Sequence, residues 1–464
     1  MRTDSGGMPR LSVLDRRRSG VLLHPSSLLT ERHAGAFGAP ARAFIDWLAA
    51  AGFSVWQMLP LGPTGADGSP YWARSDYAGN PLFIDPSLEP AGGQAAFAEY
   101  CLVNESWLDD YALYEALGRQ FGGVAWWDWP APLRDREPMA LVAATAQFAA
   151  HIAQVKRQQW QFADQWRQLR AYAHSRGVRL FGDLPIYVAP DSVTTWTQRE
   201  QFQLDAAGQP TAVAGVPPDY FAADGQLWGN PLYDWDRMRG EGFLFWRERL
   251  AAQLARFDLL RIDHFRALAA YWAVPAGERT ARNGAWRDAP GREMLEAVAR
   301  EIPDMPVVAE DLGVITPDVD ALRRDFRMPG MRVLQFAFGG DAANPHLPHN
   351  HGVDTVVYTG THDNDTTAGW YATLDDNARR HLQDYLGLWD GDGPDALMRA
   401  ALASVAQLAV LPLQDILQLG SEARLNLPGT VTGNWRWRAP PDGLTSALAR
   451  HHRELNALFG RSEP

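Results

Sequence analysis

The sequence LLRIDHF, residues 259–265, is the segment from which the fold can be predicted most directly. It is short and apolar, as a buried strand of a parallel sheet should be, and it carries charged residues toward its end. Seven more runs of this kind occur along the chain, and helical patterns lie between most of them. The eight runs span residues 21–24, 55–61, 180–188, 259–265, 307–312, 332–338, 355–359 and 409–414. This alternation predicts an α/β fold, a (β/α)8 TIM barrel.

The spacing of the runs predicts where the barrel carries insertions. About 120 residues separate the second run from the third, far more than a β-α-β crossover needs, and much of that stretch has helical patterning. We expect a helical insertion at about 87–160 and a loop insertion, dense in Gly, Pro and aromatic residues, at about 189–239. Such insertions usually lie at the carboxyl-terminal face of a barrel, where active sites are built. Barrel helices are predicted at 41–51, 162–176, 243–256 and 292–302.

The domain organisation follows from the same pattern. We expect one catalytic barrel domain over residues 20–464, with no separate C-terminal β-domain, after a flexible N-terminal extension at 1–19. The first twenty residues contain Arg but no apolar segment, so they do not have the form of a secretory signal. A chain with a single Cys and no such signal is predicted to be cytoplasmic.

The composition excludes several classes of chemistry. Cys101 is the single Cys, so neither an internal disulfide nor a Cys-held metal cluster can form, and Lys156 is the single Lys, which disfavours a Schiff-base enzyme. The chain contains neither G-K-[ST] nor G-x-G-x-x-G. The net charge of −12 argues against a nucleic-acid or anionic-membrane partner, and no apolar run is long enough to span a bilayer. We therefore expect no cofactor and no metal.

Polar residues appear late in several β-runs or just after them. They are Asp183, Arg261, Asp263, Glu310, His362 and Asp363. Side chains two apart on a strand share a face, so Arg261 and Asp263 should project together, opposite His264. A structural ion-pair network could explain any one of these residues. It explains the whole set poorly, because one Arg cannot pair with every carboxylate at the rim, and a surplus of carboxylates in a cleft is typical of acid/base and nucleophilic chemistry.

Two carboxylates that flank a bond are the catalytic groups of glycoside chemistry. One must be ionised, and we expect Arg261 to lower the pKa of Asp263 and hold it charged. The other must carry a proton, and the apolar residues before Glu310 should raise the pKa of that carboxyl. Asp363 could then bind sugar hydroxyls and stabilise positive charge that develops on the ring.

The aromatic residues suit a sugar ligand. The chain has 19 Trp, and several lie in Gly/Pro-rich, loop-like segments. Flat rings with a polar edge fit pockets whose ligands have both apolar and hydroxylated faces. We interpret Tyr71 and Trp228 as groove residues, and Trp126, Trp127 and Trp129 as residues that pack a loop onto the barrel.

From about residue 20 to about 438 the chain resembles the 4-α-glucanotransferases (amylomaltases or disproportionating enzymes, glycoside hydrolase family 77), relatives of the α-amylases. The resemblance is carried by nine blocks in the family's order. These are LPLGPTG at 59–65, SPY…AGNP…IDP at 69–86, FGDLPIYVA at 181–189, GVPPDYF…GQLWGNPLYDW at 215–235, DLLRIDHFRA at 258–267, VVAEDLGVITPDV at 307–319, NPHLPHN at 344–350, YTGTHDNDTTAGW at 358–370 and EARLNLPGT…NWRWR at 422–438. Two residues depart from the family's common pattern, Trp72 after SPY and Ala267 after HFR.

The resemblance implies a role for each matching residue. Asp263 is implied as the nucleophile, Glu310 as the general acid/base and Asp363 as the stabiliser of the transition state. The residues implied in substrate binding are Arg261, His362, Tyr71, Asp183, Trp228, Ser69 and Asn426. The implied reaction is retaining transfer of an α-1,4-glucan segment to the 4-hydroxyl of another glucan or of glucose. The implied partners are malto-oligosaccharides, amylose, glycogen or starch fragments, and glucose.

Three other functions are alternatives to glucan transfer. A retaining α-amylase-type hydrolase would use the same residues, and only its products from maltotriose would differ. A non-catalytic glucan-binding protein is disfavoured by the intact set of three carboxylates. A metal enzyme is suggested by His346, His349 and His351, but this Pro-broken loop offers no regular ligand spacing.

Overall fold

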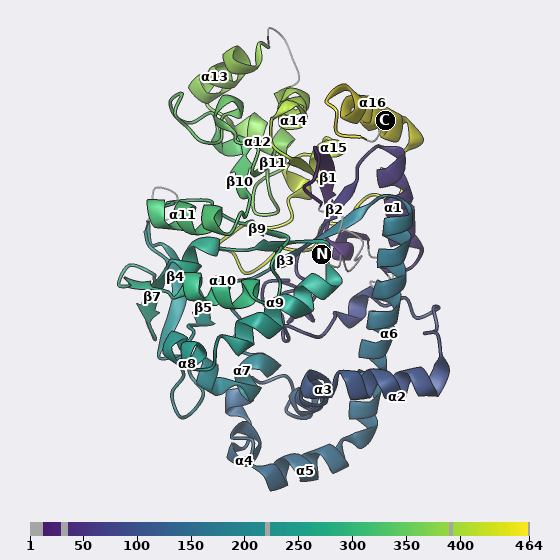
Figure 1. The fold of residues 1–464 in the computed structure, drawn as a ribbon, viewed down its shortest axis with the longest axis vertical. Helices are drawn as coiled ribbons and strands as arrows, with labels where there is room; N and C mark the ends of the chain where they lie inside the picture. Colours follow the sequence, from purple (N-terminus) through teal and green to yellow (C-terminus); the bar gives the residue numbers. More distant parts are fainter. Residues whose placement is uncertain (1–12, 29–35, 219–222, 389–392, 463–464) are drawn as a thin grey trace, which may run out of the picture.

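The computed structural model describes residues 13–28, 36–218, 223–388 and 393–462, and its core is the predicted parallel barrel (Figure 1). The strands are β1 (Arg18–Leu22), β2 (Val55–Gln57), β3 (Arg179–Leu184), β6 (Leu259–Ile262), β9 (Val307–Ala309), β10 (Gly330–Val333), β11 (Thr355–Tyr358) and β12 (Leu408–Pro412). They pair in the order β10-β11-β12-β1-β2-β3-β6-β9. The seam between β9 and β10 is bridged by a hydrogen bond from Ala309 N to the carbonyl of Pro329 (2.9 Å). The TIM-barrel prediction is confirmed.

Each predicted run overlaps one barrel strand, but most of the strands end earlier than the apolar letters do. The clearest case is the run at 332–338: β10 ends at Val333, and Leu334–Phe336 forms a 3-10 turn at the mouth of the barrel. In this turn Gln335 N still donates to the Thr359 carbonyl (3.1 Å), so the segment stays tied to the neighbouring strand while it leaves the sheet. Apolar residues alone do not mark this point, because Leu334 is buried like a strand residue although it belongs to the turn, and the apolar Phe336 is exposed.

The strands alternate between two apolar cores. One core fills the barrel and receives residues from all eight strands, among them Val55, Phe181, Leu259, Val308 and Val356. The other lies between the barrel and its helices and takes the intervening residues, such as Trp56, Leu180, Leu260 and Ile262. Because side chains two apart share a face, Asp183, Arg261 and Glu310 continue the inner face toward the mouth of the barrel.

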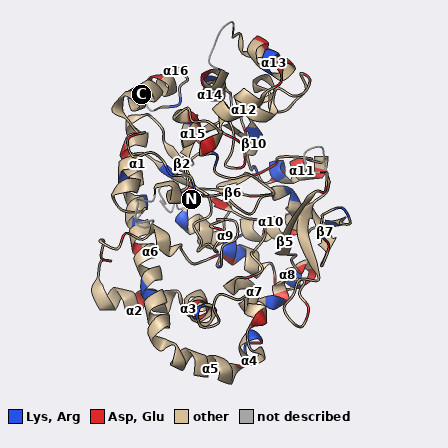
Figure 2. Ribbon diagram, turned by 180° about the vertical axis from the view of Figure 1, so that it is seen from behind, with Lys and Arg blue, Asp and Glu red and all other residues tan. Residues whose placement is uncertain are grey.

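Helices cover the outside of the barrel as predicted. The ranges 41–51, 162–176, 243–256 and 292–302 correspond to α1 (Ala39–Ala50), the second half of α6 (Ala149–Ser175), α9 (Leu244–Arg256) and α10 (Gly291–Ala299). Beyond β9 follow α11 (Pro317–Asp325), α12 (Thr367–Thr373), α13 (Asp376–Leu386), α14 (Gly393–Ala403) and α16 (Ser446–Leu458). Acidic and basic residues are interspersed along the ribbon, and both α11 and the short α8 (Trp235–Gly240) carry both signs (Figure 2).

The helical insertion extends away from the barrel in Figure 1. It contains α2 (Gly93–Val103), α3 (Glu105–Gln120), α4 (Ala131–Arg134), α5 (Pro138–Gln147) and the first half of α6. The structure separates α5 from α6 at Phe148. Helix α6 itself runs without a break from the insertion onto the barrel, so the two share one rigid element.

Two buried glutamines on α6 hold the loop that follows β2. Gln159 accepts from Gly79 N (2.8 Å) and donates to Gly79 O (2.9 Å), and Gln165 does the same with Asp85 N and O (2.8 Å each). Each side-chain amide thus pairs with the backbone N–H and C=O of one loop residue, which has no neighbouring strand to pair with. The loop 62–85, which contains Tyr71, is thereby fixed to α6.

The segment predicted as a loop at about 189–239 contains regular structure that the sequence reading missed. It holds α7 (Val193–Thr197), β4 (Ala212–Val216), β5 (Gln226–Pro231) and α8. The two strands join β7 (Ala270–Pro275) and β8 (Ala285–Asp288) in an antiparallel sheet of order β5-β4-β7-β8. The pure loop prediction is wrong here, because β4 is short, contains Gly215 and pairs with a strand more than fifty residues later. A Cβ on Gly215 would lie 2.5 Å from Gln226 O, so glycine is needed for the strands to approach.

The N-terminal prediction needs a correction. Residues 1–12 of the predicted flexible extension lie outside the described residues, but Val13 is buried and Arg18 and Ser19 already belong to β1. Arg18 Nε donates to Val13 O (2.9 Å), and Arg461 near the other end donates to Arg18 O (2.7 Å). The barrel therefore starts before residue 20. Among the described helices, none is long and apolar enough to cross a membrane.

We predict that Gln159→Leu lowers the free energy of unfolding by about 1–3 kcal/mol, because the N–H and C=O of Gly79 are left buried without a partner. Thermal unfolding followed by circular dichroism measures the change. The matched control is Gln154→Leu, at an exposed position of the same helix. Equal thermal midpoints for the two variants would contradict the anchoring role.

Candidate active site

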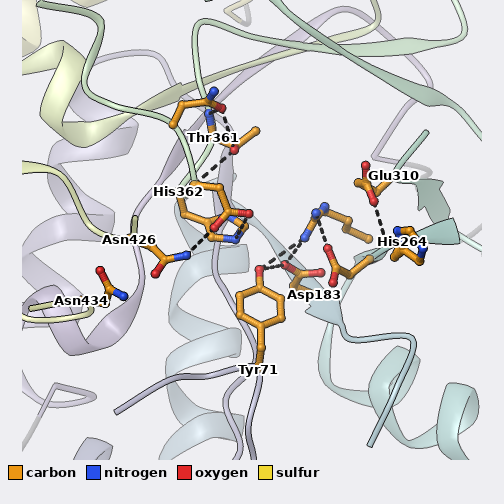
Figure 3. A network of polar contacts seen from close by, with 12 residues as sticks. Tyr71, Asp183, His264, Glu310, Thr361, His362, Asn426 and Asn434 are labelled. Carbon is orange, nitrogen blue, oxygen red and sulfur yellow. Dashed lines mark hydrogen bonds and ion pairs between the residues drawn. The ribbon is translucent and has the colours of Figure 1, made fainter. Parts of the chain in front are cut away.

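Four side chains from different parts of the chain meet at the mouth of the barrel (Figure 3). Arg261 donates from Nη1 to Asp183 Oδ2 and from Nη2 to Asp263 Oδ1, each at 2.6 Å. The Tyr71 hydroxyl donates to the same Asp183 oxygen (2.7 Å). Arg261 and Asp183 are almost fully buried, whereas the Asp263 side chain is 27% exposed. The predicted shared face of Arg261 and Asp263 is therefore present, and Asp263 is the carboxylate that reaches the groove.

Burial raises the pKa of Asp263, and the Arg261 guanidinium opposes this rise. The nearby carboxylates Asp183, Glu310 and Asp363 raise the pKa further. The expectation that Arg261 brings this pKa below its ordinary value is therefore wrong for the groove without a ligand. One guanidinium limits the rise but does not reverse it, because several acidic groups share its charge.

Glu310 follows β9 and is held by two backbone donors. Its Oε2 accepts from His264 N (2.7 Å) and its Oε1 from Leu312 N (2.9 Å). His264 has left-handed backbone angles (φ 51°, ψ 47°), an arrangement that L-residues seldom adopt. Burial raises the pKa of Glu310, as expected, while Arg261 and the two N–H groups lower it part of the way.

His362 and Asp363 lie on the loop between β11 and α12. His362 Nε2 is 3.4 Å from Asp363 Oδ2, and Asn426 Nδ2 donates to Asp363 Oδ1 (2.7 Å). Arg424 donates to the Asp363 carbonyl (2.7 Å). Burial lowers the pKa of His362, so its ring is neutral near pH 7. The carboxylate and the neutral imidazole of this loop thus lie beside the amide of Asn426, which comes from the segment after residue 423.

Aromatic rings line the groove. Tyr71 stacks on His362 with ring centroids 5.2 Å apart and planes at 15°, and Trp435 lies about 6 Å from both rings. Trp228 on β5 meets His264 edge to face, with ring centroids 4.7 Å apart. Ser69 is buried, its N–H donates to Asp67 (3.3 Å), and its carbonyl accepts from Trp72 N (3.3 Å).

The tryptophans interpreted as packing residues do pack. Trp126 and Trp129 are buried in the core of the helical insertion, and Trp127 lies against it. Trp72, one of the two departures from the family pattern, is 39% exposed, and Ala267, the other, is buried.

The His-rich loop uses its rings for structure. His346 accepts from Val333 N (3.1 Å), His351 contacts Ser404 Oγ (2.8 Å) and the His346 carbonyl (2.9 Å), and His349 contacts Tyr385 Oη (2.8 Å). Within the described part of the chain, no group of three or more His, Cys, Asp or Glu residues is arranged to hold a metal ion.

One important residue was missed in the sequence. Asp415, buried in the turn α15 (Leu413–Ile416), accepts from Thr359 Oγ1 (2.6 Å), Thr367 N (2.7 Å) and Thr367 Oγ1 (2.6 Å). It therefore joins both ends of the loop that carries His362 and Asp363. A signal exists in the sequence, since Asp415 directly follows the eighth β-run, much as His362 and Asp363 come shortly after the seventh.

The comparisons with known proteins agree with this geometry. The family model described as 4-alpha-glucanotransferase matches residues 23–92 and 88–445. The 4-alpha-glucanotransferases of Synechocystis sp. and Thermus thermophilus are each 44% identical to the chain, over 97% and 96% of it and 99% of either relative. The chloroplastic/amyloplastic enzyme of Solanum tuberosum is 40% identical, over 98% of the chain and 88% of the relative.

The solved structures agree as well. Amylomaltase from Streptococcus agalactiae in complex with acarbose is 32% identical, with a TM-score of 0.93, over 97% of this chain and 100% of that one. Amylomaltase from Corynebacterium glutamicum, 18% identical with a TM-score of 0.71, covers 97% of this chain and 75% of its own and shares the fold. The α-amylase-type alternative is not favoured, since the relatives at 40% identity or more are named as transferases. The chain belongs to the 4-alpha-glucanotransferase family (glycoside hydrolase family 77) and is a glycosyltransferase that acts on α-1,4-glucans.

Proposed function

We propose that Asp263 is the nucleophile, Glu310 the general acid/base and Asp363 the transition-state stabiliser of a retaining 4-α-glucanotransferase. The observation that carries this proposal is the cluster in which one buried Arg261 joins Asp183 to the partly exposed Asp263. Of the three, Asp263 is the group with both access to the groove and a cation that favours its charged form. A nucleophilic carboxylate needs both.

In the proposed reaction, Asp263 attacks the anomeric carbon of a bound α-1,4-glucan while Glu310 gives its proton to the leaving oxygen. A covalent glucosyl-enzyme forms and the shortened glucan leaves. Glu310 then takes the proton from the 4-hydroxyl of an acceptor glucan, whose oxygen displaces Asp263, so the new bond keeps the α configuration. No atom beyond donor and acceptor is consumed, and no cofactor is required.

The raised pKa values of Asp263 and Glu310 support a state in which one of the two carboxylates is charged and the other is protonated. The chemistry needs one carboxylate charged and one protonated, and two buried acidic groups near each other resist being ionised together. The 2.6 Å contact with Arg261 favours the charge on Asp263. Glu310, which accepts two neutral N–H donors and has no such direct cation contact among its described hydrogen bonds, then retains the proton.

The remaining groove residues are proposed to bind the glucan. Tyr71 and His362 offer a stacked aromatic surface, and Asp183, Arg261, Asp363 and Asn426 offer hydroxyl partners beside it. Ser69 stays a candidate from the sequence motif alone. We propose malto-oligosaccharides, amylose, and glycogen or starch fragments as donors, and glucose as an acceptor. We further propose a cytoplasmic location.

Transfer is favoured over hydrolysis only where an acceptor sugar is bound and water is kept from the covalent glucosyl-enzyme. We propose that the loop at 215–230, whose residues 219–222 lie outside the described residues, restricts water. The contact between Trp228 and His264 supports this, because it places an indole ring against the residue that directly follows the proposed nucleophile.

We predict that Asp263→Asn and Glu310→Gln each abolish the conversion of maltotriose into glucose plus longer oligosaccharides. With α-glucosyl fluoride as donor, whose leaving group needs no acid, Glu310→Gln should recover formation of the glucosyl-enzyme, whereas Asp263→Asn should not. Product chromatography and mass spectrometry of the intact protein report the two steps. The control is Glu296→Gln, at an exposed position. Near-normal transfer by either variant would refute its assigned role, and shorter products alone from the wild type would indicate a hydrolase.

We predict that Asp183→Asn moves the acid limb of the pH profile of kcat/KM to lower pH. Asp183 raises the pKa of Asp263, so removing its charge lowers that pKa, and the nucleophile stays ionised in more acidic solution. The profile for maltotriose transfer measures the shift. An acid limb that stays in place or moves upward would contradict the coupling.

We predict that Asp415→Ala lowers kcat about 100-fold, because freeing both ends of the loop displaces His362 and Asp363. Asp415→Asn should retain more activity, since an amide still accepts one of the three hydrogen bonds. Steady-state kinetics with maltotriose measure the effect, with the exposed Asp384→Ala as control. A wild-type kcat for Asp415→Ala would show that the loop does not depend on this carboxylate.

A further inference from the structure

Beneath the Asp183–Arg261–Asp263 cluster, the interior of the barrel contains four buried polar atoms that lack a hydrogen-bond partner among the described protein atoms. They are Gln57 Oε1, Asp183 Oδ1, Arg261 Nε and Tyr358 Oη. All four residues are nearly or fully buried, and Tyr358 has no exposed surface at all. Buried polar atoms without partners are rare in native proteins, so four in one region require an explanation.

Strand periodicity places the four residues at one level of the barrel. Gln57, Asp183, Arg261 and Tyr358 each come two residues after an apolar residue of the inner core, on β2, β3, β6 and β11. They therefore point inward, just above the apolar layer and just below the nucleophile. Burial raises the pKa of Tyr358, while the charge of Arg261 and the Gln57 amide lower it and Asp183 raises it. The phenol thus lies within electrostatic reach of the other three groups.

The four groups complement one another chemically. Arg261 Nε is a donor only, Gln57 Oε1 and Asp183 Oδ1 are acceptors, and the Tyr358 hydroxyl can donate or accept. Donors and acceptors in these numbers can satisfy one another within one layer, directly or through an ordered water. A purely structural core would have used an apolar ring at position 358, since a phenol among aliphatic residues gains nothing from its hydroxyl.

Arg261 is the member through which the layer reaches the chemistry. Its Nη1 donates to Asp183 and to the Tyr71 hydroxyl and its Nη2 donates to Asp263, whereas Nε has no partner among the described protein atoms. Because a guanidinium is planar, fixing Nε fixes the plane in which the other two nitrogens lie. A partner that accepts from Nε lies in this plane and therefore sets where Nη2 points, and with it the position and charge of Asp263.

We propose that Tyr358 and Gln57 are positioning residues of the transferase. They complete a polar layer that holds the Arg261 guanidinium in the orientation in which its Nη2 donates to Asp263. The inference rests on the proposed role of Asp263 as the nucleophile. The inference adds Tyr358 and Gln57 to the residues that support catalysis, although neither contacts the glucan or the reacting atoms. It also explains why polar atoms from four strands are buried together under the site.

The test is Tyr358→Phe, which removes one hydroxyl and keeps the ring. We expect kcat for maltotriose transfer to fall about tenfold with little change in KM. We also expect the acid limb of kcat/KM to move to higher pH, because a loosely held Arg261 stabilises the Asp263 anion less. The matched control is Tyr111→Phe, a buried tyrosine of the helical insertion, which should behave as wild type.

A structural role alone gives different results. If Tyr358 merely fills the core, Tyr358→Phe leaves kcat and the pH profile unchanged and the thermal midpoint equal or higher, and the proposal is overturned. That failure is distinct from failure of the proposed function, which would appear as transfer activity in Asp263→Asn.

Gln57→Leu provides the second arm. It should lower kcat in the same direction, and its effect combined with Tyr358→Phe should be smaller than the product of the two single effects, because both disrupt one layer. Effects that multiply independently would overturn the shared layer. A high-resolution crystal structure should show Tyr358 Oη hydrogen-bonded to another member of the layer or to a water that bridges to one. An Oη whose polar neighbours all lie beyond about 3.5 Å would overturn it as well.

Discussion

The buried guanidinium of Arg261 is the interaction around which the mouth of the barrel is arranged. It is the cation in direct contact with Asp183 and Asp263, and it also opposes the rise in the pKa of Glu310. A charge removed from water is tolerated only when partners surround it. Strand β3, the loop after β2 and the turn after β6 each contribute a partner of Arg261. The electrostatics of the site therefore depend on buried side chains as well as on the exposed carboxylate.

Much of this arrangement could be predicted from the sequence, because local periodicity and chemistry agree there. Leu259, Arg261 and Asp263 alternate with Leu260 and Ile262, and the structure places the two sets on opposite faces of β6. The same reasoning located Glu310 after β9. The eight runs gave the barrel because buried parallel strands are uniformly apolar. Where the direction of a side chain depends on a single strand, the sequence pattern is sufficient to predict that direction.

The rest depends on contacts between distant segments. Strand β4 exists because β5 and β7 lie beside it, and its own residues are too few and too mixed to indicate a strand. The part played by Asp415 depends on Thr359 and Thr367, which precede it by about fifty residues. The direction of the Asp263 pKa shift depends on the sum of burial and four charged neighbours, of which the sequence reading weighed only Arg261. Each is a property of the assembled site.

The way the second sheet is attached to the barrel has a mechanical consequence. After Asp263 the chain makes one short turn and enters β7, which pairs with β4, and β4 pairs with β5, the strand that bears Trp228. The Trp228 indole and the Asp263 carboxylate are thus connected through backbone hydrogen bonds across β5, β4 and β7. With the roles proposed above, a glucan that displaces the indole would also strain the segment that holds Asp263. Ligand binding and the alignment of the attacking oxygen would then be coupled by the stiffness of the sheet.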